Sequence, residues 1–339
     1  MPGFSLFLDA LTLAVLIAYV LSVLVALLPT PRHDAVSLSR EARLRLFLPA
    51  GGALLVLALG FWPTLRSILA GTPDHCLEAG AHHPPLCWLH GVGGQGSSHD
   101  IAVLLVLLTC AAAAIWQAYQ WAQAHGRLKL LSMLADTGRE APLRSQLNEW
   151  GIEWPGEIQV VAIGFPFCFV MGWRHPRLIL STAVLDGLTP AQVSAVVAHE
   201  RAHLDRRDNA WRVMAHLASL AHLPGLGQRA YRRWAFGAEV ACDAMAAARL
   251  GSRYAVADAL VRFQRLLNER GESGKALSPL GVAFLQAGML DRRVRLLLEN
   301  PPSARSIFRF WPWLLLPVVF WQADAIHQAL EVLLEVLHG

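Results

Sequence analysis

The segment His199-Glu200-Arg201-Ala202-His203 places two histidines four residues apart, with a glutamate beside the first. The residues before it predict a helix independently, because Thr189-Pro190-Ala191-Gln192 has the pattern of a capping box and an apolar run of valines follows. Residues four apart share one face of a helix, so a helix over residues 191–204 brings both imidazoles together. The H-E-x-x-H pattern on a helix is typical of a zinc site in which the glutamate, here Glu200, acts as general base.

A catalytic zinc site needs a third protein ligand and leaves one position open for water. Downstream, Glu239 and Asp243 lie four residues apart on a second predicted helix and share a face. We expect Glu239 to complete a set of two histidines and one glutamate for a single Zn²⁺, and Asp243 to accept a hydrogen bond from the far nitrogen of a ligating histidine. The alternative is that both carboxylates lie on a solvated helix face. Cys242, between them, is explained by packing or by a role as a spare ligand.

These segments resemble the gluzincin peptidases, and among them the M56 family of membrane-embedded antirepressor metalloproteases that includes BlaR and MecR. The resemblance spans about residues 161–298 and includes four matching stretches, at residues 175–181, 188–189, 198–208 and 239–243. It implies a cytosolic α+β zinc endopeptidase domain, in which Glu200 takes the proton of the zinc-bound water and passes it to the leaving amine. Asp208 also matches the family pattern; a catalytic role, a helix-end role and pairing with arginine are all open for it.

Three short strands are predicted before the motif, over residues 158–163, 167–171 and 178–181. In gluzincins the strand nearest the zinc helix is a sheet edge that pairs with an extended substrate. The resemblance therefore indicates Leu178, Ile179 and Leu180 as a substrate-binding edge strand, since such an edge binds a peptide through its main chain. An ordinary buried sheet is the alternative.

The composition predicts a membrane protein, because 55% of the residues are hydrophobic and the mean hydropathy is +0.40. We expect a mainly α membrane protein with about four transmembrane helices, the peptidase domain being inserted between the third and fourth. The candidate spans are residues 10–28, 46–65, 101–125 and 310–323, the last followed by an amphipathic tail at 325–338. A re-entrant segment is the alternative for the shorter fourth span.

The positions of the cations predict the topology. Residues 29–45 carry four arginines, whereas residues 71–100 contain no lysine or arginine. The positive-inside rule then places the N-terminus and the 71–100 loop outside and the peptidase domain in the cytosol of a multi-pass protein of the bacterial inner membrane.

The net charge of +4 is a consequence of this topology and does not indicate direct nucleic-acid binding. The expected organisation is 1–70 with two transmembrane helices, 71–100 as an extracytoplasmic loop, 101–126 as the third transmembrane helix, 127–305 as the peptidase domain, and 306–339 as the fourth transmembrane helix and tail.

The predicted outer loop contains Cys76 and Cys87, which could form a disulfide there; two free thiols are the alternative. The loop also carries five histidines, interpreted either as a metal or pH sensor or as incidental residues of a Gly/Pro-rich loop. Near the C-terminus, Leu290–Glu299, with Arg292, Arg293 and Arg295, is predicted as an amphipathic helix.

The expected partners are a protein substrate, namely a cytosolic repressor or the chain itself, the lipid bilayer, and a second copy in a homo-oligomer. The chain has no S-x-x-K sequence and ends soon after the fourth candidate span, so we expect no penicillin-binding sensor domain.

Two alternatives to a regulatory endopeptidase stay open. One is a membrane-protein quality-control protease of the HtpX type, although that type has transmembrane helices between the motif and the ligand glutamate. The other is a non-proteolytic signalling or scaffold protein with a structural zinc, which normally fills four protein positions where three are evident here.

Overall fold

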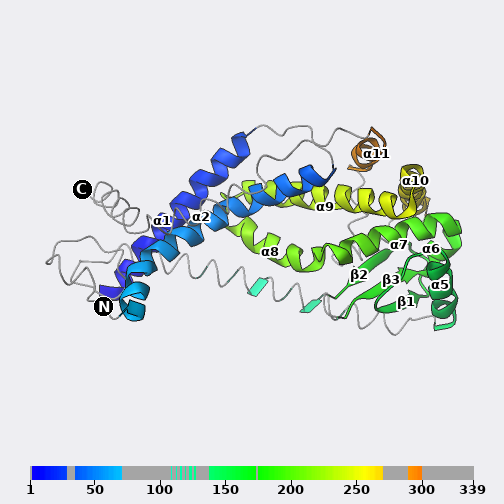
Figure 1. Ribbon diagram of the computed structural model, residues 1–339, viewed down its shortest axis with the longest axis horizontal. Helices are drawn as coiled ribbons and strands as arrows, with labels where there is room; N and C mark the ends of the chain where they lie inside the picture. The colour runs from blue at the N-terminus through cyan, green and yellow to red at the C-terminus, as the bar shows by residue number, and fades with distance from the viewer. Residues whose placement is uncertain are drawn as a thin grey trace.

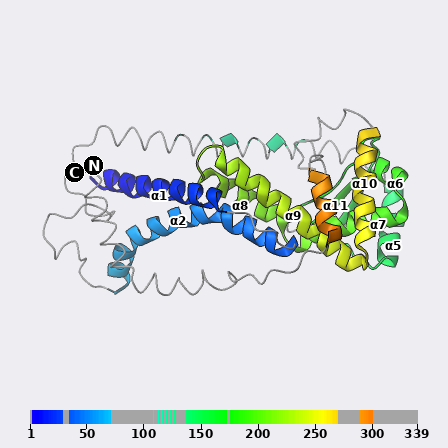
Figure 2. The same cartoon turned by 90° about the horizontal axis from the view of Figure 1, so that it is seen from above.

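The computed structural model describes residues 2–28, 35–70, 137–172, 175–269 and 289–299, with a few isolated positions between 108 and 126. Within these ranges the chain forms an elongated arrangement, with a pair of long helices at one end and a small sheet at the other (Figures 1 and 2). The predicted disulfide residues Cys76 and Cys87, the loop around them, the third and fourth predicted spans and the C-terminal tail lie outside these ranges.

The helix pair consists of α1 (Pro2–Leu27) and α2 (Ala35–Ala70), which pack against each other. Helix α2 also crosses α8 (Asp208–Leu220) and α9 (Leu226–Leu250), as Figure 2 shows. Leu46 of α2 is fully buried there in an apolar cluster with Ala215, Ala218 and Trp234. Helices α2 and α9 approach closely at Gly237, where an added Cβ would lie 3.0 Å from the Cα of Ser39. A bare glycine backbone is what allows this approach.

Among the described residues, no helix combines the length and the apolar character that crossing a bilayer requires. The prediction of a mainly α membrane protein with about four transmembrane helices is therefore wrong, and so is the predicted location as a multi-pass inner-membrane protein. Some of the apolar residues of α1 and α2 pack against other helices, whereas others, such as Leu24 and Leu54, are exposed. Leu46, at the start of the second predicted span, is buried against α8 and α9, and Ala14 and Ala18 of α1 are buried as well. Hydropathy alone does not separate an apolar face that packs on protein from one that faces lipid.

The sheet contains β1 (Glu157–Val161), β2 (Cys168–Met171) and β3 (Arg177–Ser181), so the three predicted strands are confirmed. Its order is β1-β3-β2, with β1 parallel and β2 antiparallel to β3. The predicted edge strand is wrong, because Leu178, Ile179 and Leu180 lie in β3, which pairs on both sides. All three side chains are at most 2% exposed, as expected for the central strand. The edge strand that packs next to the motif helix is β2.

Helix α7 (Pro190–Asp205) carries the H-E-x-x-H motif and lies between the sheet and the helices α9 and α10 (Arg253–Glu269). Val193, Val196 and Val197 of α7 are buried in the main apolar core, which therefore extends from the sheet across α7 to α10. The remaining described helices are α5 (Thr137–Glu149) beside β1, the short α6 (Thr182–Gly187) before α7, and α11 (Leu290–Glu299) on α9 and α10, which confirms the predicted helix there.

Candidate metal centre

The start of α7 is fixed by the predicted capping box, which the structure confirms. The Gln192 backbone N–H donates to Thr189 Oγ1 at 3.3 Å, and the Thr189 N–H donates to Gln192 Oε1 at 3.0 Å. These bonds satisfy backbone donors that the first helical turn leaves free. Three turns further on, His199, Glu200 and His203 are all buried in the interior. The cap and the valine-rich core thus set the position of the motif.

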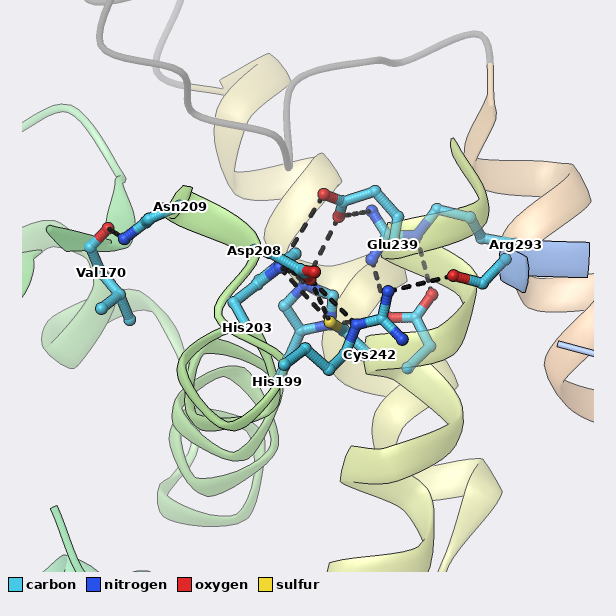
Figure 3. A network of polar contacts seen from close by, with 11 residues as sticks. Val170, His199, His203, Asp208, Asn209, Glu239, Cys242 and Arg293 are labelled. Atoms are coloured by element: carbon cyan, nitrogen blue, oxygen red, sulfur yellow. Dashed lines mark hydrogen bonds and ion pairs between the residues drawn. The ribbon is translucent and has the colours of Figure 1, made fainter. Parts of the chain in front are cut away.

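The structure brings His199 and His203 of α7 together with Glu239 of α9 (Figure 3). The Nε2 atoms of the two imidazoles are 3.1 Å apart. Glu239 Oε2 lies 3.4 Å from His199 Nε2, and Oε1 lies 3.5 Å from His203 Nε2. Two imidazole nitrogens and a carboxylate therefore surround one point, and these donor types are the ones that zinc accepts.

Asp243, one turn after Glu239 on α9, lies behind His199. Its Oδ1 is 2.8 Å from His199 Nδ1, the ring nitrogen that faces away from Glu239. The same carboxylate accepts two hydrogen bonds from Arg293 of α11, from Nε at 2.8 Å and from Nη2 at 2.7 Å. Asp243 is 1% exposed, so this pairing is shielded from solvent. A carboxylate in this place fixes the tautomer and the orientation of a ligating imidazole.

Asp208 occupies the corresponding position behind His203. Its Oδ2 is 2.9 Å from His203 Nδ1 and also accepts a hydrogen bond from Arg206 Nε at 3.0 Å. Arg207 has φ +57, and this left-handed residue turns the chain so that α8 begins directly after α7, with Asp208 folded back toward the site. The position of Asp208 favours support of His203 together with arginine pairing over a helix-end role.

The charges of the site favour a cation between the three donors. Burial by itself lowers the pKa of His199, but hydrogen bonds to Asp243 and Glu239 outweigh it and raise the pKa to about 9. Burial would raise the pKa of Glu239, yet His203, Arg293 and His199 hold it well below its usual range. The fully buried imidazole of His199 thus holds an extra proton beside the ionised carboxylate of Glu239. The site therefore already favours positive charge at the point where the three donors meet.

The donor set also fits a metal by its hydrogen bonding. When both imidazoles are neutral and donate their Nδ1–H to Asp243 and Asp208, both Nε2 atoms present lone pairs toward one point and are 3.1 Å apart. A cation at that point takes the place of the proton that His199 otherwise holds. In addition, Glu239 Oε2 is buried and lies 3.4 Å from His199 Nε2 and 3.3 Å from Arg293 Nη1, so positive charge already faces this oxygen. The residues present therefore fit a divalent metal.

Glu200 lies on the same turn of α7 as His199 and His203 and is 5% exposed. Burial raises the pKa of Glu200, against the effect of the neighbouring histidines and a hydrogen bond from the backbone of Val170 in β2. A carboxyl group whose pKa is raised binds a proton more readily than an ordinary glutamate, which suits a group that takes up and returns a proton.

Cys242, the predicted spare ligand, has its Sγ 3.3 Å from His203 Nδ1 and 3.5 Å from Asp208 Oδ2. It thus lies on the Asp208 side of the imidazole, away from the meeting point of the Nε2 atoms. Burial raises the pKa of its thiol well above the usual value, and Asp208 adds to that shift. A thiolate is the form that binds metal, so a neutral thiol at this place favours packing.

The sequence did not single out Arg293 as a member of the site. The sequence pattern that could have identified Arg293 is its position on the apolar side of α11. Leu290, Val294 and Leu297, which lie three residues before it, one after it and four after it, all pack against the core. An arginine on the apolar side of an amphipathic helix needs a buried partner. The identity of that partner, Asp243, depends on tertiary structure.

A capped helix with H-E-x-x-H and a carboxylate from a second helix together define the metal-dependent peptidases of the H-E-x-x-H type. Comparison with protein families agrees, since the model of the BlaR1 peptidase M56 family matches residues 94–319, more than half of the chain. The chain belongs to the M56 peptidase family, and the predicted resemblance is confirmed.

One curated relative is the plastoglobule-localized metallopeptidase 48, chloroplastic, of Arabidopsis thaliana. The two proteins are 29% identical over 86 residues, which make up 23% of this chain. The matched segment covers 25% of the length of the relative, so the chain spans only a part of it. The similarity agrees with a metallopeptidase.

Proposed function

We propose that this chain is a zinc-dependent endopeptidase, with one Zn²⁺ held by His199, His203 and Glu239. The observation that carries the proposal is the convergence of these three buried donors, with each histidine backed by its own carboxylate. Three protein ligands leave the fourth zinc position for water, which is the arrangement of catalytic rather than structural zinc sites.

Zinc in this site would acidify its bound water and polarise the scissile carbonyl. The protein supplies the remaining parts of the reaction. Glu200 accepts the proton of the attacking water and returns it to the leaving amine, and the raised pKa of its buried carboxyl group suits both steps. Asp243 and Asp208 keep the protons of His199 and His203 on Nδ1, so that both Nε2 atoms stay available to the metal.

For the substrate we propose a protein that is cut in regulated proteolysis, either a repressor or a second copy of this chain. Membership of the family described as BlaR1 peptidase supports this choice. The two substrates can be separated by using the Glu200→Gln variant as an inactive target. Cleavage of a tagged Glu200→Gln chain by the parent protein indicates self-processing between copies.

The test of the function compares the purified parent with Glu200→Gln, which keeps the size of the side chain but removes the base. We expect both proteins to bind one zinc per chain and only the parent to cleave an unfolded protein substrate, measured by mass spectrometry of the products. Equal inactivity of both zinc-loaded proteins on every substrate, including the chain itself, would instead support a non-proteolytic protein with a structural metal.

A further inference from the structure

Arg293 of α11 is 5% exposed and reaches the metal-binding side of α9 (Figure 3). Its guanidinium donates to both oxygens of Asp243, and its Nη1 lies 3.3 Å from Glu239 Oε2. One side chain therefore contacts both the carboxylate behind His199 and the proposed ligand Glu239. The paired, parallel bonds to Asp243 fix the plane of that carboxylate, which a single hydrogen bond would not do.

The two histidines have matching supports. Asp243 is held by Arg293, and Asp208 is held by Arg206. The charges are balanced as well, because the buried carboxylates Glu200, Asp208, Glu239 and Asp243 are opposed by two arginines and, in the loaded site, by a divalent cation. Loss of Arg293 leaves this group one positive charge short and leaves Asp243 with its contact to His199. A buried carboxylate without its partner is strongly unfavourable.

We propose that Arg293 is a positioning residue of the metal centre, which fixes Asp243 and through it the ring of His199. This inference rests on the proposed function. Helix α11 then completes the centre, although its sequence lies fifty residues after Asp243. The rival role for Arg293 is a plain salt bridge that attaches α11 to α9.

Other contacts already attach α11, which makes the two roles separable. Leu297 is buried, Leu290 and Val294 pack against the core, and the guanidinium of Arg292 lies 4.7 Å from the ring centre of Phe236. A substitution of Arg293 alone therefore leaves an apolar anchor for the helix. Arg295 on the same helix provides a matched control, because its side chain is 62% exposed and pairs with Asp291 at the surface.

The experiment measures zinc affinity by competition with a chromophoric chelator, together with the visible absorption of the Co²⁺-loaded protein. We expect Arg293→Met to weaken zinc binding about 10- to 100-fold, the usual effect of losing a group that supports a metal ligand. Arg293→Lys keeps the positive charge but lacks the planar guanidinium group that makes two parallel hydrogen bonds. Its zinc affinity should therefore fall between those of Arg293→Met and the parent. Both variants should change the Co²⁺ spectrum, and Arg295→Met should change neither measurement.

A second pair of proteins, built on Arg293→Lys, keeps the test decisive if Arg293→Met does not fold. In Asp243→Asn the carboxylate charge is absent, so adding Arg293→Lys should weaken zinc binding less than it does in the parent. The proposal is overturned if Arg293→Lys or Arg293→Met has the parental zinc affinity and Co²⁺ spectrum. It is also overturned if the Arg293→Lys effect is equally large in both backgrounds. A parent protein that binds no zinc would overturn the proposed function itself.

Discussion

Asp208 Oδ2 lies 2.9 Å from His203 Nδ1, although the two residues belong to different helices. The contact depends on the turn at Arg207, which separates α7 from α8 and returns the chain toward the motif. Arg206, on the other side of that turn, donates to the same oxygen and to Ser39 Oγ of α2. The polar support of His203 thus connects the candidate metal centre to the first turns of α2.

Asp208→Asn should weaken zinc binding about 10- to 100-fold, because the amide cannot accept a charge-assisted hydrogen bond from both His203 and Arg206. Chelator competition measures the affinity. Asp205→Asn is the control, since Asp205 ends α7 three residues before Asp208 but pairs with Arg201 and Arg249 in a solvent-exposed position. Equal affinities for the two variants would show that Asp208 does not support the ligand.

Zinc affinity should rise with pH through the neutral range and level off near pH 9. In the metal-free protein the pKa of His199 is about 9, so below that pH zinc must displace a proton from His199. The apparent affinity then increases about tenfold per pH unit until His199 is neutral without metal. Chelator competition at a series of pH values checks this slope. An affinity that stays flat between pH 7 and pH 9 contradicts it.

Arg207→Val should lower the free energy of unfolding by about 1–2 kcal/mol, because a β-branched side chain clashes with the backbone at the left-handed φ of this residue. Arg207→Gly relieves that clash but makes the unfolded chain more flexible, so we expect a change of less than about 1 kcal/mol. Urea unfolding of the metal-free proteins gives both values. If the two variants are equally stable, the turn does not constrain position 207.

Leu46→Ala should lower the free energy of unfolding by about 2–5 kcal/mol, because it leaves a cavity where α2 packs on α8 and α9. Leu48→Ala provides the matched control, since Leu48 lies two residues further along the same helix and is 51% exposed. We expect the control to change stability by less than about 0.5 kcal/mol in urea unfolding. Equal effects would mean that α2 does not pack on α8 and α9 as described.

The predictions that held depend on local patterns. The capping box needs only Thr189, Pro190 and Gln192, and the histidines of the motif are one helical turn apart, so the sequence determines their geometry. Glu239 and Asp243 share a face of α9 for the same reason. The meeting of the two helices was expected from the family resemblance.

The predictions that failed depend on long-range packing. Strand order is not contained in the strands themselves, and β3 lies at the centre because it pairs with both β1 and β2. The apolar run at Leu46 has the length of a membrane span, yet its first residue packs on Trp234 of α9. Arg293 was counted among the cations of an amphipathic helix, because its contact with Asp243 exists only in the folded chain.

X-ray absorption at the zinc edge of the loaded protein tests the metal centre most directly. We predict nitrogen and oxygen neighbours alone, at about 2.0–2.2 Å, with the multiple scattering of two imidazoles. The same measurement on Glu239→Gln should show an altered set of neighbours at the zinc. A sulfur neighbour at about 2.3 Å would place Cys242 on the metal and contradict the assignment of His199, His203 and Glu239 as the ligands.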